Sequence, residues 1–182
     1  LELSLHLARR GDRVWATMRD LDKRGPLLER AEAESLQLEF AQLDVQDSES
    51  VQRCVADVLR EAGRVDVLIN NAGAGFVRTT EQATEEEIRW QLDVNLVGVI
   101  RCTKAVLPAM REAGAGHIVN ITSVGGLVGQ PFNELYCAAK FGVEGYTESL
   151  ASYVQPELGV RFTLVEPGGI VSEFANCVLR QF

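Results

Sequence analysis

A tyrosine and a lysine stand four positions apart in the stretch ELYCAAKFGVEGY, residues 134–146. On an α-helix, Tyr136 and Lys140 would share one face, with their side-chain roots about 5 to 6 Å apart. A nearby cation favours the phenolate, and lowering a tyrosine pKa from about 10 to about 7 requires roughly 4 kcal/mol. The spacing therefore predicts a phenol that exchanges a proton near neutral pH. The alternative is a chance pair on the surface, without chemistry.

Two short apolar runs end in polar residues that could join this pair. The run VDVLINN ends in Asn70 and leads into Ala72 and Gly73, which are small enough for a flat ligand to approach the backbone. The amides could also tie neighbouring strands together, and a plain turn is equally open. The run HIVNITS ends in Ser123, which would either cap the next segment or converge with Tyr136 on one oxygen atom.

Asn95 and the pair Pro167-Gly168 also allow both a structural and a functional interpretation. Asn95 lies inside a long helical pattern, where asparagine competes for the backbone. It predicts either a simple kink or a local distortion that frees a carbonyl for an ordered water beside Lys140. Pro167 and Gly168 follow the last apolar run, as a turn or as a lid over a flat ring.

The elements that must position these residues alternate along the chain. β-Branched and apolar runs predict strands at residues 13–19, 36–45, 65–71, 117–123 and 160–167. Helical patterns cover residues 2–10, 21–33, 48–62, 84–113 with a break, and 133–155. Thr84 and Glu87 form a predicted capping box, so the run of glutamates at 85–87 is a solvated first turn rather than a metal site. Helices between buried strands predict a doubly wound α/β domain with a parallel sheet, whose ligands lie beyond the carboxyl ends of the strands.

Composition narrows the class of protein. The 182 residues, 46% of them hydrophobic, suffice for one globular domain, which we expect to span residues 1–182. The net charge of -8 argues against a nucleic-acid partner. The four cysteines show no metal-binding or redox spacing and are typical of small buried residues in a reducing compartment. Because of this spacing, we expect no metal site. No apolar run is long enough for a membrane span and no signal pattern opens the chain, so we expect no membrane span and a cytoplasmic location.

The chain resembles the short-chain dehydrogenase/reductase family over essentially its whole length. The resemblance rests on the order and spacing of Asn70 to Gly73 (NNAG), Asn95, Ser123, Tyr136-x-x-x-Lys140 and Pro167-Gly168. The stretch SVGGLVGQPFNELYCAAKFGVEGYTESLA resembles in particular the branch of hydroxysteroid and retinol dehydrogenases. The resemblance implies an NAD(P)-dependent oxidoreductase of Rossmann-like fold. It further implies that Tyr136 exchanges the proton of the substrate oxygen, Ser123 orients that oxygen, Lys140 lowers the pKa of the phenol and binds the nicotinamide ribose, and Asn95 anchors a water.

The same resemblance assigns cofactor contacts. Asp44 matches the residue that meets the adenine, Ala72 and Gly73 line the adenosine half, and Ile170 and Ser172 match the carboxamide clamp. The full expected set, besides Tyr136 and Lys140, is Arg19, Asp44, Asn70, Ala72, Gly73, Pro167, Gly168, Ile170 and Ser172.

Cofactor preference depends on the end of the first strand run. Met18 stands where NAD-preferring members carry an acid, and Arg19 follows it. A guanidinium pairs with phosphate, whereas a carboxylate would repel it. The sequence predicts a preference for NADP(H), with NAD(H) possible.

Two departures from the family pattern concern the ends. The family opens with a strand and a glycine-rich phosphate loop, but this sequence begins at LELSLHLARRG and stops at Phe182, before the family's substrate-covering region. We interpret it as part of a longer polypeptide, with weak cofactor binding expected of this stretch alone.

We expect a small, fairly apolar carbonyl or alcohol substrate, with a steroid, a retinoid or another lipid-like ketone as examples. Gly125, Gly126, Leu127, Val128, Pro131 and Phe132 would form an apolar wall, although they could equally be core. The apolar helices at 93–113 and 133–155 predict a homodimer or homotetramer. A dinucleotide-sensing protein of the same fold without turnover is the alternative function.

Overall fold

The computed structural model describes residues 1–170, so the expected carboxamide contact Ser172 and the fourth cysteine, Cys177, lie outside the described residues. The chain divides into two compact units, Leu1–Gly63 and the part from Arg64 onward. Each unit has its own parallel sheet. The expectation of a single domain over residues 1–182 stays a prediction.

The first unit contains α1 (Glu2–Arg9), β1 (Trp15–Met18), η1 (Leu21–Arg24), α2 (Gly25–Ala33), β2 (Glu39–Gln42) and α3 (Ser48–Ala62). Strands β1 and β2 pair in parallel, with Trp15 opposite Glu39 and Met18 opposite Gln42. Apolar side chains from both helices and strands form its core: Leu5, Ala16, Leu27 and Ala31, with Leu36, Leu38 and Phe40 against them. This core fixes the carboxyl end of β1, where Arg19 follows.

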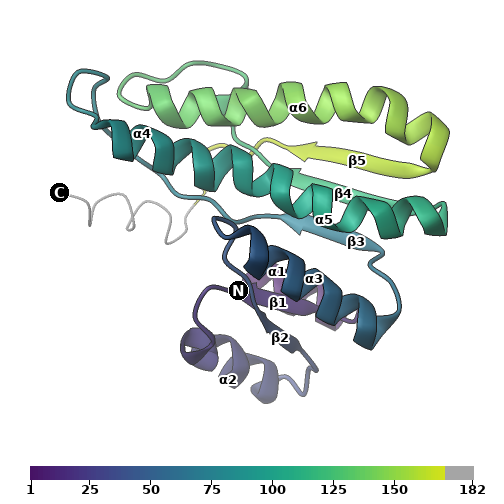
Figure 1. Ribbon diagram of the computed structural model, residues 1–182. Coiled ribbons are helices and arrows are strands. Elements are labelled where there is room, and N and C mark those ends of the chain that lie inside the picture. Colours follow the sequence, from purple (N-terminus) through teal and green to yellow (C-terminus); the bar gives the residue numbers. More distant parts are fainter. Residues whose placement is uncertain (171–182) are drawn as a thin grey trace. The chain divides into compact units, whose positions relative to one another are not determined.

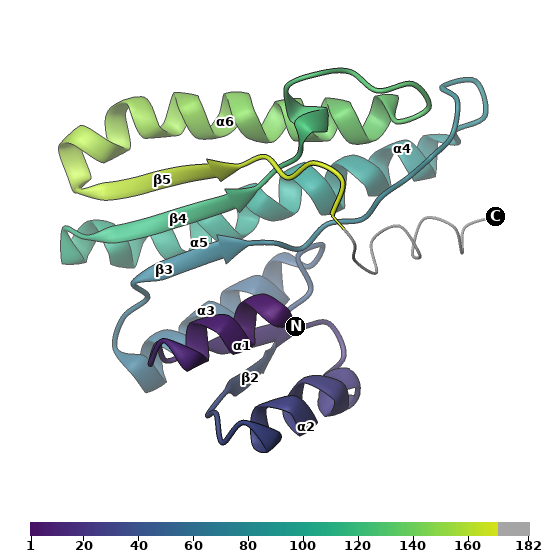
Figure 2. The same ribbon diagram turned by 180° about the vertical axis from the view of Figure 1, so that it is seen from behind.

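The second unit carries the chemistry-bearing residues. It contains β3 (Val67–Asn70), α4 (Glu85–Leu92), η2 (Asp93–Val97), α5 (Gly98–Ala113), β4 (Gly116–Ile121), η3 (Val124–Gly126), α6 (Glu134–Leu158) and β5 (Val160–Val165). Its sheet is parallel in the order β3-β4-β5. The loops that follow β3 and β4 lie at the same end of this sheet in both views (Figures 1 and 2). That end is the carboxyl edge, where ligands are expected in such sheets.

The predicted elements agree with the observed ones in type and order, which confirms the α/β class with parallel strands joined by helices. The capping box at the start of α4 is also confirmed, because Thr84 Oγ1 accepts from Glu87 N at 3.2 Å and Glu87 Oε2 accepts from Thr84 N at 2.9 Å. Strands are shorter than predicted, because the paired segments end before the predicted runs do. No helix within residues 1–170 is long and apolar enough to cross a membrane.

The predicted break in the long helix is a π-helical turn, η2, between α4 and α5. Its ladder contains a bond from Gly98 N to Asp93 O, five residues back. Such single turns insert one extra residue and occur often at functional sites. Asn95 lies within it and is fully buried.

Candidate active site

Tyr136 and Lys140 lie on the same buried face of α6. Tyr136 is 9% exposed and Lys140 is 4% exposed. The Lys140 Nζ lies 5.6 Å from the centroid of the Tyr136 ring. It donates a hydrogen bond of 3.0 Å to the carbonyl oxygen of Ile121, the last residue of β4. The helix therefore holds the pair together, and the end of the neighbouring strand anchors its cation.

Ser123 follows β4 and meets Tyr136 from the end of that strand. Its Oγ accepts from the backbone N–H of Gly125 at 3.1 Å, which caps η3. Its hydroxyl also forms a hydrogen bond with the Tyr136 phenol, and this bond lowers the pKa of the tyrosine. Capping by Ser123 is confirmed, and the capping hydroxyl also meets the phenol. The convergence of both groups on one oxygen atom of a ligand stays a prediction.

The direction of the Tyr136 pKa differs from the sequence expectation. Burial raises the pKa of Tyr136, the bond from Ser123 lowers it, and Cys137 raises it, with burial the largest of the three. Lys140 is not among these causes, because its ammonium points to Ile121 O rather than to the phenol oxygen. Burial also lowers the pKa of Lys140 to about 8, against a smaller opposing effect of Glu144. Without a bound ligand, the phenol is therefore not poised near neutral pH.

Asn95 binds both polar groups of one backbone residue, Ala74. Its Nδ2 donates to Ala74 O at 2.9 Å and to Gln91 O at 3.2 Å, while its Oδ1 accepts from Ala74 N at 3.1 Å. A local distortion is present at Asn95, and its amide lies toward the loop after β3. The freed carbonyl and the ordered water expected there stay predictions. A Cβ added to Gly73 would lie 2.8 Å from Asn95 Oδ1 and 3.7 Å from Lys140 Nζ. The Gly73 backbone is thus pressed against two of the predicted catalytic residues.

The side chain of Asn70 forms hydrogen bonds to buried neighbours on β4 and α5. Its Nδ2 donates to Asn120 Oδ1 at 2.8 Å and more weakly to Thr103 Oγ1 at 3.3 Å. Asn120 Nδ2 in turn donates to Thr147 Oγ1 at 2.8 Å, so this buried chain ties β3, β4, α5 and α6 together. The expected tie between neighbouring strands is confirmed. A cofactor contact by Asn70 stays a prediction.

The segment after β5 lies beside the segment after β4. Val124 N donates to Pro167 O at 3.1 Å, which places Pro167 next to the turn that follows Ser123. Gly168 and Ile170 are exposed, Ile170 by 64%. Ala72 and Gly73 are exposed as well. These positions are accessible to a ligand, and their expected cofactor contacts stay predictions.

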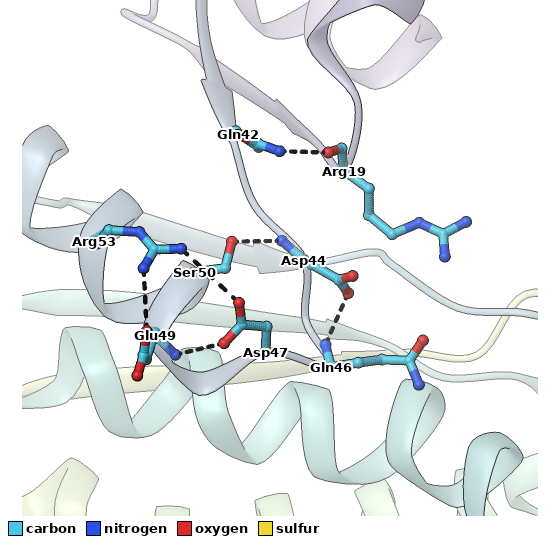
Figure 3. A network of polar contacts seen from close by, with 8 residues as sticks. All are labelled: Arg19, Gln42, Asp44, Gln46, Asp47, Glu49, Ser50 and Arg53. Carbon is cyan, nitrogen blue, oxygen red and sulfur yellow. Dashed lines mark hydrogen bonds and ion pairs between the residues drawn. The ribbon is translucent and has the colours of Figure 1, made fainter.

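Arg19 and Asp44 belong to the first unit, where Figure 3 shows their surroundings. The backbone oxygen of Arg19 accepts from Gln42 Nε2 at 3.0 Å, while its exposed guanidinium points away from this network (Figure 3). Asp44 N donates to Ser50 Oγ at 3.0 Å, and Asp44 Oδ1 accepts from Gln46 N at 3.0 Å. No ion pair engages the Arg19 guanidinium within the residues that the structure describes. This charge is available to an anion.

Two buried residues of this region were missed by the sequence analysis. Gln91, four residues before Asn95, donates through Nε2 to Ala74 O at 3.1 Å, and its Oε1 is buried without a hydrogen-bond partner among the described residues. Glu144, four residues after Lys140, is 8% exposed, and its Oε1 also has no partner there. The helical spacing to a predicted catalytic residue was the available signal for both.

The assembled groups match the chemistry of proton exchange at a carbonyl or alcohol oxygen. A phenol and a hydroxyl meet at the sheet edge, with a buried amine one helical turn away. Lys140 makes one hydrogen bond to the described residues, to Ile121 O, and so retains donors for the hydroxyls of a ligand. The bare backbone at Gly73 suits the close approach of a flat ring or a ribose. These residues fit a nicotinamide dinucleotide. Residues 1–170 contain no group of three or more His, Cys, Asp or Glu that could hold a metal ion.

Comparisons with known proteins agree with this geometry. The chain is 45% identical to retinol dehydrogenase 8 of Bos taurus, over 100% of this chain and 58% of the relative. It is 43% identical to 17-beta-hydroxysteroid dehydrogenase type 1 of Homo sapiens, over 97% of this chain and 56% of the relative. Its structure matches that of a metagenomic short-chain oxidoreductase in complex with NADP at a TM-score of 0.85 and 30% identity, over 98% of this chain and 82% of the other.

The chain spans little more than half the length of these two curated relatives. Their names confirm the similarity to the hydroxysteroid and retinol dehydrogenase branch, and the structural match confirms the Rossmann-like fold. The family model described as short chain dehydrogenase matches residues 1–181. This chain is therefore a member of the short-chain dehydrogenase family.

Proposed function

We propose that the protein interconverts a secondary alcohol and a carbonyl, with NADP(H) as the preferred cofactor. The observation that carries the proposal is the meeting of the buried Tyr136 and Lys140 with the half-buried Ser123 at the carboxyl edge of the sheet. A bound nicotinamide supplies or accepts the hydride at the carbon next to the reacting oxygen. The protein must then move one proton at that oxygen.

The Tyr136 phenol gives or takes this proton, because it is the acidic group that the Ser123 hydroxyl bonds. Ser123, held by Gly125 N, orients the substrate oxygen toward the phenol. Lys140 would bind ribose hydroxyls with its remaining donors and, when charged, favour the phenolate. Asn95 holds Ala74 and thereby the loop that a cofactor would face.

A fairly apolar substrate is supported by the loop between η3 and α6. Leu127, Val128 and Phe132 are 58%, 66% and 58% exposed, which is unusual for such side chains unless they contact a ligand or partner. The similarity to a retinol dehydrogenase and a hydroxysteroid dehydrogenase supports a retinoid, a steroid or another lipid-like ketone.

The preference for NADP(H) is supported by the exposed guanidinium of Arg19 and by the apolar Met18 before it. A 2′-phosphate would pair with Arg19 in a fork, whereas NAD(H) lacks this group. Arg19→Ala should raise the KM for NADPH about tenfold or more and leave that for NADH nearly unchanged. Arg24→Ala, which removes an exposed guanidinium from the end of η1, is the control. Equal or better efficiency with NADH in the unmodified protein would contradict the preference.

Turnover itself is tested with Tyr136→Phe. The variant should lose activity on a panel of ketones with NADPH by about 10²- to 10⁴-fold while its cofactor affinity, measured by NADPH fluorescence, is retained. Tyr153→Phe, on the same helix but 53% exposed, is the matched control. An unmodified protein that binds NADPH but reduces no ketone of the panel would favour the dinucleotide sensor.

We also propose a cytoplasmic homodimer or homotetramer that uses α5 and α6. Phe141 and Tyr153 of α6 are 45% and 53% exposed, and large exposed apolar side chains mark interaction surfaces. The buried cysteines Cys54, Cys102 and Cys137 suit a reducing compartment. Sedimentation of Phe141→Glu against unmodified protein tests the assembly, and a monomer in both samples at micromolar concentration would reject it.

A further inference from the structure

Glu144 is a buried acidic residue that the proposed proton exchange does not use. It lies one turn after Lys140 on α6 and is 8% exposed. Its Oε1 has no hydrogen-bond partner among the described residues. Leaving a carboxylate oxygen buried and unpaired costs free energy. A residue of this kind calls for a reason other than stability.

The position of Glu144 gives that reason. A Cβ added to Gly126 would lie 3.2 Å from Cγ and Oε1 of Glu144 and 3.2 Å from the carbonyl oxygen of Lys140. The side chain of Glu144 thus packs against Gly126, in the turn that follows Ser123, and Gly126 also lies beside the backbone of Lys140. Lys140 and Glu144 stand four residues apart on α6, and Lys140 is 4% exposed, so solvent screens an attraction between them only weakly.

Other titratable or charged groups lie on α6 and on the elements around it. The elements packed against α6, together with α6 itself, carry these titratable or charged groups: Glu85, Glu86, Glu87, Arg89, Asp93, His117, Glu134, Tyr136, Cys137, Tyr146, Glu148, Tyr153, Glu157 and Arg161. Several are engaged elsewhere, Asp93 with Arg101 at 2.8 Å and Glu87 with Arg78 at 3.1 Å. Glu144 is the one charged side chain of the described residues that acts on the pKa of Lys140, and it raises that pKa.

We propose that Glu144 is a positioning residue of this site, whose buried carboxylate keeps Lys140 protonated and so preserves the cation beside the phenol. Burial alone drives the ammonium toward its neutral form. The unpaired carboxylate opposes this without a direct ion pair, which would compete with the bond from Lys140 to Ile121 O. The ammonium remains charged and also free to bind ribose hydroxyls. The catalytic consequence rests on the proposed function, whereas the charge relation does not.

The titration of Lys140 can be measured directly. The chain contains only three lysines, and the other two, Lys23 and Lys104, are exposed. Protein labelled with ¹³C at lysine Cε would give three titrating signals, and Lys140→Arg would identify that of Lys140. In Glu144→Gln the Lys140 midpoint should fall by about half a pH unit or more. Glu148→Gln, which removes an exposed charge from the next turn of α6, should leave it in place.

Glu144→Met serves as a second variant, since it removes the carboxylate without leaving a buried amide in its place. An unchanged Lys140 midpoint in either folded variant would overturn the proposal. In the active protein, kcat/KM falls on the alkaline side where Lys140 loses its proton. The pH of this fall should be lower in Glu144→Gln, by the same amount as the Lys140 midpoint, and unchanged in Glu148→Gln. A shifted midpoint in a protein that reduces no ketone would reject the proposed function and leave the role of Glu144 standing.

Discussion

Lys140 and Tyr136 share one face of α6, yet the ammonium of Lys140 bonds the Ile121 carbonyl of the neighbouring strand and not the phenol. The Nζ lies 5.6 Å from the centre of the tyrosine ring. With both groups buried, loss of water is the largest cause of each pKa shift, and neither group is among the causes of the other's shift. The pair is therefore an assembled but unactivated acid and base, and a ligand that bridges the two groups would complete it.

The buried ammonium of Lys140 should destabilise the folded protein at neutral pH. Its pKa falls from 10.5 to about 8, so between these values the unfolded chain binds a proton that the folded chain does not, and stability rises with pH. The difference corresponds to about 3 kcal/mol. Lys140→Met should therefore gain about 2 to 3 kcal/mol at neutral pH, some of it offset by the unpaired Ile121 carbonyl, and lose this advantage by pH about 10.5.

Urea unfolding at a series of pH values measures this change. Lys104→Met, on an exposed part of α5, is the control and should show no such dependence on pH. A Lys140→Met protein that is less stable than the unmodified one at neutral pH would mean that the ammonium has further partners.

The phenol of Tyr136 should titrate above free tyrosine in the absence of cofactor. Burial raises its pKa from the ordinary value of 10.0, and the bond from Ser123 partly offsets this. Ultraviolet difference titration of the unmodified protein against Tyr136→Phe isolates this group from the two other tyrosines. Ser123→Ala should raise the midpoint further, whereas Ser152→Ala, on the exposed side of α6, should not. A midpoint below 10 would show that Lys140 activates the phenol unaided.

The sequence predicted the members of this site because helical spacing and strand ends depend on local order alone. Tyr136 and Lys140 had to share a face once α6 formed, and Ser123 had to lie at the carboxyl edge once β4 formed. The partner of Lys140 could not be predicted in this way. The bond to Ile121 O depends on how α6 crosses β4, and the sign of each pKa shift depends on burial that only packing creates.

Asn95 also shows which features the sequence can predict and which it cannot. Its poor helix propensity indicated a distortion within residues 84–113, which the π-helical turn η2 confirms. No sequence pattern indicates that its amide binds both polar groups of Ala74, because this pairing requires the loop after β3 to fold back on the helix. Contacts of this long range lie beyond any periodic pattern.

Gly73 should tolerate no side chain. An alanine Cβ there would lie 2.8 Å from Asn95 Oδ1, and Asn95 cannot yield because it is buried and bonded to Ala74. Gly73→Ala should cost about 1 to 3 kcal/mol of unfolding free energy and weaken NADPH binding. Gly129→Ala is the matched control, since nothing lies within 4 Å of its added Cβ. Equal stability of the two variants in urea unfolding would show that the loop after β3 moves freely.

Gln91 and Asn95 both bond Ala74, but their removal should have opposite consequences. Gln91→Met keeps the length of the side chain and removes an Oε1 that is buried without a partner, while Ala74 O still accepts from Asn95 Nδ2. Its unfolding free energy should stay the same or rise by about 1 kcal/mol. Asn95→Leu leaves Ala74 N without its acceptor and should lose about 1 to 3 kcal/mol together with activity. Urea unfolding of both variants decides the matter: a Gln91→Met protein that is destabilised as much as Asn95→Leu would place a bonded water, and not an unpaired oxygen, at Gln91.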